Sequence, residues 1–314
     1  MTTPPNALPE TLLDTQAVAA VQIPATRVLY WSVRRELWEN RSIYIAPLVA
    51  AGLSMLGFFV SLTQLPRYVR MPSADPRHQF IMLVMPYGHT AWLLLLTAFL
   101  VGVFYSLDAL HGERRDRSIL FWKSLPVSDR TTVLSKAAIP LVVLPVLVFA
   151  ITVVTHLVML ALSTAVLLLS GLNPFILWRQ VPLFQMELIL LYGLAVLALG
   201  QAPLYAWLLL VSGWARRTVF LWAVLPLLAI CVVEKLVFNT THFLAMLGNR
   251  LLGGSPDAFS FITPSGAPVD PHFIPLSQIT PGRFLGSPDL WIGLAFAALF
   301  LAVAVRVRHY REPI

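Results

Sequence analysis

The amino-acid sequence predicts an all-α integral membrane protein that crosses a lipid bilayer six times. Only 12% of its 314 residues are charged and 58% are hydrophobic, whereas soluble domains usually carry about 25% charged residues. The apolar residues also form long uncharged runs, and a helix needs about 20 such residues to span a bilayer. The 24 prolines agree with this interpretation, because neighbouring helices in a membrane can satisfy the backbone groups that a proline frees.

Two short segments precede the first predicted span. Residues 1–23 are polar, contain several prolines and lack the basic and apolar regions of a signal peptide, so we expect a disordered cytoplasmic tail. Residues 24–41 are predicted to form an amphipathic helix, in which an aliphatic stripe (Leu29, Val33 and Leu37) runs beside basic and aromatic stripes. That combination suits the headgroup plane of a membrane, although a soluble helix packed beneath the spans would show the same pattern.

Six spans are predicted within residues 42–312. The apolar runs place them at 43–62, 89–107, 139–160, 183–211, 219–237 and 290–305. The uncharged stretch from 137 to 178 is too long for one helix, so a further helix or a short loop is expected after the third span. Residues 108–136 connect spans two and three on one side of the membrane. On the other side, residues 239–289 form a long outer loop rich in Pro, Gly and Ser.

Lys and Arg residues are divided unequally between the two sides of these spans. Fifteen of the 22 lie on the side that holds both termini and the connection 108–136, and seven lie on the other side. Since cytoplasmic segments carry an excess of Lys and Arg, both termini are predicted to be cytoplasmic, which requires an even number of spans. The same placement argues against a nucleic-acid partner despite the net charge of +7, because the basic residues do not form one contiguous patch.

The connection 108–136 is predicted to form a helix, a turn and a second helix. Charges alternate over residues 113–117, and Pro126 ends the first helix because its ring cannot extend the hydrogen-bond ladder. Ser128 or Asp129 is predicted to N-cap the second helix, which then continues into span three.

Phe121 and Trp122 belong to an apolar patch of this connection that stays outside the bilayer. Exposed aromatic residues beneath a membrane are typical of a docking surface for a cytoplasmic partner. An ordinary loop that follows the positive-inside rule would need the basic residues, but neither this patch nor the turn at Pro126.

The connection reads Glu-Arg-x-x-x-Ser-Ile-Leu from Glu113, then Ser-Leu-Pro-Val-Ser-Asp-Arg up to Arg130, and closes with Lys136. This pattern resembles the ABC-2 type permeases of bacterial ABC transporters. The motif covers about 30 residues, and the amphipathic helix and six-span layout extend the resemblance to most of the chain. The resemblance implies an ABC-2 exporter-like fold in the bacterial cytoplasmic (inner) membrane.

The resemblance also implies partners. A cytoplasmic ABC ATPase would dock on the connection 108–136, bind ATP and Mg, and drive export. A second permease copy or paralogue would complete a dimer within the membrane lipid. The implied ATPase-coupling residues are Glu113, Arg114, Arg115, Asp116, Phe121, Trp122, Pro126, Ser128 and Arg130.

The chain itself contains no nucleotide-binding or catalytic motif. The G-x-x-x-x-G-K-[ST] phosphate loop, H-E-x-x-H and G-x-S-x-G are absent, and no histidines have the spacing of metal ligands. We therefore expect no catalytic residue, metal or cofactor here, and do not expect this chain to be an enzyme. The alternative function is a membrane-anchored sensor or scaffold whose connection 108–136 binds a cytoplasmic signalling partner.

Three polar residues inside the predicted spans form a candidate substrate pathway. Charges inside a membrane are costly and are functional candidates, which applies to Glu187 and Glu234, both near the outer ends of their spans. Gln201 lies deeper, where a hydrogen bond between helices is the expected role. Two alternatives stay open: Glu187 pairs with Arg179, and Glu234 reaches the headgroups together with Lys235.

Overall fold

The computed structural model describes residues 24–70, 76–116, 118, 127–252, 257–259 and 276–310. This part of the chain is helical apart from short connections, and it has six helices long and apolar enough to cross a membrane. It contains no strand, only an isolated antiparallel bridge between Phe259 and Ile279. The prediction of an all-α protein with six helices long and apolar enough to span a membrane is confirmed, whereas the predicted tail 1–23 lies outside the described residues.

Long helices alternate with short ones along the described chain. Their order is α1 (Ala25–Glu39), α2 (Ser42–Arg70), α3 (Pro76–Asp108), α4 (His111–Arg115), α6 (Asp129–Ala138), the π-helical turn η2 (Ile139–Val143), α7 (Leu144–Leu169), α8 (Phe175–Gln180), α9 (Leu183–Trp214), α10 (Val219–Val233), the π-helical turn η3 (Glu234–Phe238), α11 (His242–Leu252), the 3₁₀ turn η4 (Leu276–Gln278), α12 (Pro281–Gly286) and α13 (Pro288–Tyr310).

The membrane-spanning helices extend beyond the predicted spans. In the clearest case, α6, η2 and α7 form one continuous helix over Asp129–Leu169, where the sequence predicts a span at 139–160. The predicted ends lie where charges begin, but residues such as Lys136 continue a helix readily because straight side chains lose little rotamer freedom in it. The expected element after span three is the short helix α8.

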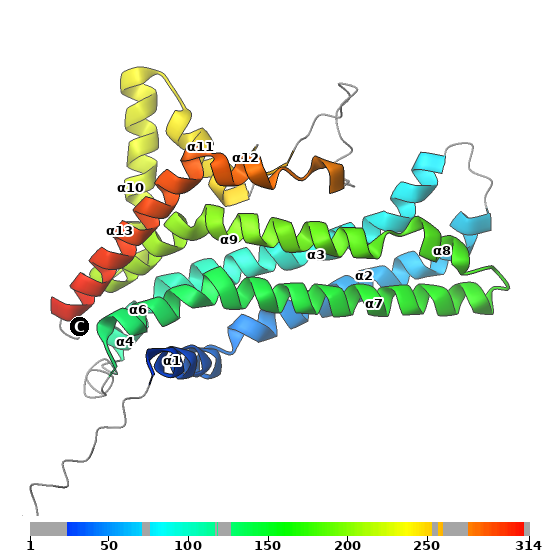
Figure 1. Ribbon diagram of the computed structural model, residues 1–314, viewed down its shortest axis with the longest axis horizontal. Helices are drawn as coiled ribbons and strands as arrows, with labels where there is room; N and C mark the ends of the chain where they lie inside the picture. Colours follow the sequence, from blue (N-terminus) through cyan, green and yellow to red (C-terminus); the bar gives the residue numbers. More distant parts are fainter. Residues whose placement is uncertain are drawn as a thin grey trace, which may run out of the picture.

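Four of the long helices lie side by side. In Figure 1, α2, α3, α7 and α9 run along the long axis of the molecule; α2 contacts α3 and α7, and α9 contacts α3. α13 packs against α9 over an extensive surface. Separate clusters of buried apolar residues lie between the helices, one including Leu94 and Ile139 and another including Tyr87 and Leu167. The buried apolar residues are therefore distributed along the bundle in several clusters and do not form one central core.

α3 and α9 approach closely because residue 102 is a glycine. The Tyr205 hydroxyl of α9 lies 2.9 Å from the position that a Cβ atom would take on Gly102. A larger side chain there would force the Tyr205 ring to move. Tyr205 is buried, and its hydroxyl donates a hydrogen bond to Gln201 Oε1 on the same helix at 3.1 Å.

α10 contributes little to the bundle core. It rises steeply away from the other long helices in Figure 1, and Ala223 is the single buried residue of this fully described helix. Large apolar side chains such as Phe220 and Leu225 are 58% and 57% exposed. A helix that is apolar on every face, yet unburied within its own chain, suits contact with lipid or with another chain in the membrane.

α1 crosses beneath the bundle and packs against α6. Figure 1 shows it nearly end-on, whereas α2 and α7 run across the picture. Val33 and Leu37 pack against a buried cluster of the bundle, while the Arg34 guanidinium stacks over the rings of Trp31 and Trp38 at 5.0 and 4.9 Å on the exposed face. The predicted amphipathic helix is thus present, and its position in the headgroup plane stays a prediction.

The two ends of α9 are predicted to face opposite compartments. In a Cys231→Ala background, which removes the native cysteine, a cysteine replaces the exposed Arg179, before α9, or the exposed Arg217, after it. Because cytoplasmic segments are rich in Lys and Arg, a membrane-impermeant maleimide added to intact cells should label Arg179→Cys and spare Arg217→Cys. Opened vesicles should allow both to react, and the reverse pattern in intact cells would contradict the predicted orientation.

Candidate functional site

The predicted coupling connection lies at the end of the bundle where α1, α4, α6 and the last turns of α13 meet (Figure 1). Phe121, Trp122 and Pro126 lie outside the described residues. The structure describes the other six predicted coupling residues and divides them into a buried and an exposed group. The buried pair is Glu113 and Arg114, and the exposed group is Arg115, Asp116, Ser128 and Arg130.

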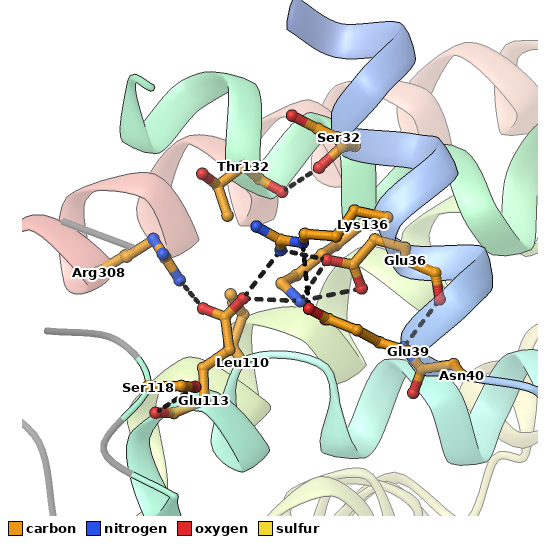
Figure 2. A network of polar contacts seen from close by, with 12 residues as sticks. Ser32, Glu36, Glu39, Asn40, Leu110, Glu113, Ser118, Thr132, Lys136 and Arg308 are labelled. Carbon is orange, nitrogen blue, oxygen red and sulfur yellow. Dashed lines mark hydrogen bonds and ion pairs between the residues drawn. The ribbon is translucent and has the colours of Figure 1, made fainter. Parts of the chain in front are cut away.

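Glu113 occupies the centre of a network of buried charges (Figure 2). Its Oε1 lies 3.0 Å from Lys136 Nζ and 3.4 Å from Arg35 Nη2, and its Oε2 accepts a hydrogen bond from Arg308 Nη1 at 2.5 Å. The side chains of Glu113, Lys136 and Arg308 are each less than a tenth exposed. Helices α1, α4, α6 and α13 therefore meet at this one carboxylate.

Glu36 is the second carboxylate of the network and is completely buried. It accepts hydrogen bonds from Lys136 Nζ at 3.0 and 3.1 Å, from Arg35 Nη2 at 2.7 Å and from the Tyr105 hydroxyl at 2.8 Å. Burial by itself raises the pKa of Glu36, but Lys136 and Arg35 outweigh this effect and the net pKa is lowered. The neighbouring cations therefore favour the ionised form of this buried carboxylate.

We call Arg35, Glu36, Glu113, Lys136 and Arg308 the ion cluster. Arg308 also donates to Asp129 Oδ1 at 3.1 Å through its Nε, so the first residue of α6 is tied to α13. Of the two predicted N-cap residues, Ser128 caps α6, because its hydroxyl accepts the Thr131 N–H at 3.1 Å. With Asp129 and with Glu39, which lies 3.5 Å from Arg35, four carboxylates face three cations.

Arg114 fastens α4 to the end of α9. Its Nη1 donates to the carbonyl oxygens of Gly213 at 2.9 Å and Ala215 at 3.2 Å. The Ser212 hydroxyl in turn accepts the N–H groups at the start of α4, from Leu110 at 3.1 Å and His111 at 2.9 Å. These bonds satisfy backbone groups that a helix end leaves without intrahelical partners. They also fix α4 to α9, in addition to the helices that it meets in the ion cluster.

The exposed surface of α4 is charged. Arg115 and the adjacent Asp116 are 60% and 63% exposed, and the Arg115 Nε lies 3.1 Å from Asp116 Oδ1. Arg115 also lies 3.7 Å from Asp108 at the end of α3. Surface ion pairs of this kind contribute little to stability, so these side chains are available to a partner without disturbing the fold.

Sequence reasoning missed Arg35, Glu36, Tyr105 and Arg308 as members of this site. For Glu36 a signal was present, because it lies seven residues after Leu29 and three after Val33, on the aliphatic stripe of α1. A charge on that stripe needs a buried partner. For Arg308 no signal was present, since the last basic residues of a span are expected at its cytoplasmic end in any case.

A second polar site lies between α3, α7 and α9, and it includes the predicted pathway residue Glu187. Glu187 pairs with His156, not with Arg179: its Oε1 lies 2.5 Å from His156 Nδ1. The other ring nitrogen of His156, Nε2, lies 3.0 Å from the backbone oxygen of Tyr87. The ring of Tyr87 meets the imidazole edge-on at 5.4 Å between centroids.

These contacts fix how many protons the His156–Glu187 pair holds. A backbone carbonyl only accepts hydrogen bonds, so Nε2 must carry a proton. The contact between Nδ1 and the carboxylate also needs a proton between them, on either atom. Whichever atom carries it, the pair has no net charge, which is the state that a membrane interior tolerates best.

Gln201 makes the interhelical hydrogen bond expected of it. Its Nε2 donates to the Leu251 carbonyl of α11 at 3.3 Å, and its Oε1 accepts from Tyr205. Both side chains line a cavity of about 380 Å³ between α3, α7 and α9 that also includes Pro140 of the π-helical turn. Its remaining lining is apolar, so the predicted pathway residue borders a cavity suited to apolar molecules.

Glu234 organises the turn between η3 and α11. One carboxylate oxygen accepts the Thr240 hydroxyl and the His242 N–H, both at 2.8 Å, and the other accepts the Phe243 N–H at 2.9 Å. A carboxylate at this position satisfies the free N–H groups of the helix start and complements the helix dipole. These bonds give Glu234 a structural role at the start of α11.

Replacing Lys136 by Met is expected to destabilise the fold strongly. It leaves Glu36 and Glu113 buried with one cation fewer, and breaking a buried ion pair typically costs about 3–5 kcal/mol. Unfolding in mixed micelles, followed by circular dichroism, measures the loss. Arg115→Met on the exposed side of the same cluster of helices is the matched control, and its unfolding midpoint should not change. A similar loss in both variants would contradict the structural role of the ion cluster.

Replacing Glu187 by Gln is expected to preserve stability, whereas Glu187→Leu should reduce it. A carboxamide N–H can donate to His156 Nδ1, while leucine leaves that buried nitrogen unpaired at a cost of about 1–3 kcal/mol. The same unfolding measurement compares the two. If Gln is as damaging as Leu, a hydrogen bond between residue 187 and His156 Nδ1 is not what stabilises this contact.

The chain matches no protein-family model, and comparison with curated proteins and with solved structures likewise finds no match.

Proposed function

We propose that this chain is the permease subunit of an ABC-2 type transporter, an exporter whose ATPase is a separate cytoplasmic chain. The observation that carries the proposal is the ion cluster. Glu113 precedes the segment 117–126 and Lys136 follows it, and both are held in the same buried network. A partner that displaces this segment would therefore displace α1, α6 and α13 together.

The route from docking to transport follows from the helix connections. A movement of α6 continues into α7 without a break, because α6, η2 and α7 are one helix. That helix borders the 380 Å³ cavity lined by Gln201 and Tyr205. Tilting it against α9 would open the cavity alternately to the two sides, which is alternating access. The apolar lining favours an apolar or lipid-like substrate.

The rest of the proposed assembly is supported by charge and exposure. The excess of Lys and Arg at the ion-cluster end favours a cytoplasmic position for that end and for both termini. The partner ATPase would dock there, against the exposed Arg115, Asp116 and Arg130. ATP and Mg would be bound by the ATPase itself. The exposed apolar surface of α10 favours contact with a second permease copy or paralogue. The bacterial inner membrane is the location that the resemblance to ABC-2 type permeases implies.

A membrane-anchored sensor or scaffold is the second candidate function. The exposed charges of α4 would suit a signalling partner as well as an ATPase. Co-purification separates the two: a partner that carries the G-x-x-x-x-G-K-[ST] loop supports transport, and a partner without it supports the scaffold.

Exchanging Arg115 and Asp116 tests the docking surface without disturbing the ion cluster. The double variant Arg115→Asp, Asp116→Arg keeps the net charge and opposite charges at the two positions, but it removes the exposed contact with Asp108 and alters the pattern that a partner meets. We expect loss of the ATP hydrolysis that the purified complex shows in nanodiscs, with an unchanged unfolding midpoint of the permease. This exchange is sharper than reversing Glu113 and Arg114, which are buried and would test folding at the same time.

The control for this experiment is Arg217→Glu, an exposed charge change at the same end of the bundle, in the connection between α9 and α10. It should retain ATP hydrolysis. Full activity in the exchanged variant would exclude the α4 surface as the site of coupling.

A further inference from the structure

A groove lies between α6 and α13, on the outside of the bundle beside the ion cluster. Its volume is about 970 Å³, within the range of about 300–1,000 Å³ found for small-molecule sites. Val133 and Leu134 of α6 face Leu301 and Val305 of α13 across it. Both helices belong to segments that are long and apolar enough to cross a membrane, so this apolar wall suits an acyl chain.

The mouth of the groove is positively charged. Arg130 and Arg306 line it and are exposed. The acidic residue of the lining, Asp129, is already engaged by Arg308 and His309, at 3.1 and 3.3 Å. Two arginine charges therefore remain to attract an anion at the end of an apolar groove.

The part of the groove below its arginines has about the length of one leaflet's hydrocarbon layer. On α13 it extends from Ala298 to Arg306, and eight residue steps of α-helix measure about 12 Å. Half of a hydrocarbon core is about 15 Å thick. A molecule that fills the groove would thus place its apolar part in one leaflet and its anionic part at the surface of that leaflet.

We propose that the groove between α6 and α13 binds an anionic phospholipid, with the phosphate between Arg130 and Arg306 and an acyl chain along Leu134, Leu301 and Val305. Basic pockets between membrane helices are general sites for anionic headgroups, and arginine binds phosphate in a bidentate manner. The apolar wall distinguishes this site from one for a soluble phosphate. The site does not depend on an ATPase partner.

Bound lipid would occupy the outer side of the contact between α6 and α13. Asp129 and Arg308 join these helices on the side of the ion cluster, and the lipid would join them on the other side through Arg130 and Arg306. The proposed site therefore adds a link between the same two helices that a docking partner would displace.

Native mass spectrometry of the purified chain tests the proposal. Phosphatidylglycerol and phosphatidylcholine with identical acyl chains are titrated against the wild type and the double variant Arg130→Gln, Arg306→Gln. The wild type should prefer phosphatidylglycerol, and the variant should bind it about tenfold more weakly, because each basic residue near an anionic surface contributes several-fold in affinity.

Two further variants make the test specific. Arg216→Gln, Arg217→Gln removes the same charge from exposed positions at the same end of the bundle, and it should keep the preference. Ala302→Trp fills the groove and keeps both arginines, and it should lose binding. The proposal is overturned if the wild type has no preference, if the control loses binding equally, or if Ala302→Trp binds as the wild type does.

Discussion

The pairing of Glu36 and Glu113 with buried cations is the constraint on which the charged end of the molecule depends. An ionised carboxylate without a partner is very costly in a medium of low dielectric constant. Neither carboxylate finds its full set of partners on its own helix: Glu36 needs Lys136, and Glu113 needs Lys136 and Arg308. The positions of α1, α4, α6 and α13 at this end therefore depend on one another, because each helix supplies a partner for a charge on another.

The opposite end is held by other means. Glu234 caps α11 with hydrogen bonds to backbone N–H groups, and the neutral pair of His156 and Glu187 joins α7 to α9. A further ion pair joins Arg250 of α11 to Asp289 at the start of α13 at 2.9 Å. Each of these contacts is a separate pair or cap, whereas the ion cluster joins four helices in one network. A bundle that is rigid at one end and more lightly joined at the other suits the proposed transport cycle, in which movement begins at the charged end.

The number and type of the long helices could be predicted because a helix that crosses a membrane needs about 20 consecutive apolar residues, and such runs are visible in the sequence. Their ends could not, since α3 and α6 continue through polar residues that no longer face lipid. The site was predictable only in part. Glu113 and Arg114 stand out in sequence, but their burial comes from contacts with Arg308 and the end of α9, about a hundred residues or more away in sequence. Local patterns carry no information about such pairs.

The distance along the chain between Glu113 and Arg308, 195 residues, sets an order of assembly. Ribosomes add about 5–20 residues per second, so Arg308 emerges roughly 10–40 seconds after Glu113. During that interval Glu113 can pair with Lys136 but lacks its α13 partner. Completion of the ion cluster thus marks the moment when the newly made chain closes, and a protease that recognises open membrane proteins would have this interval in which to act.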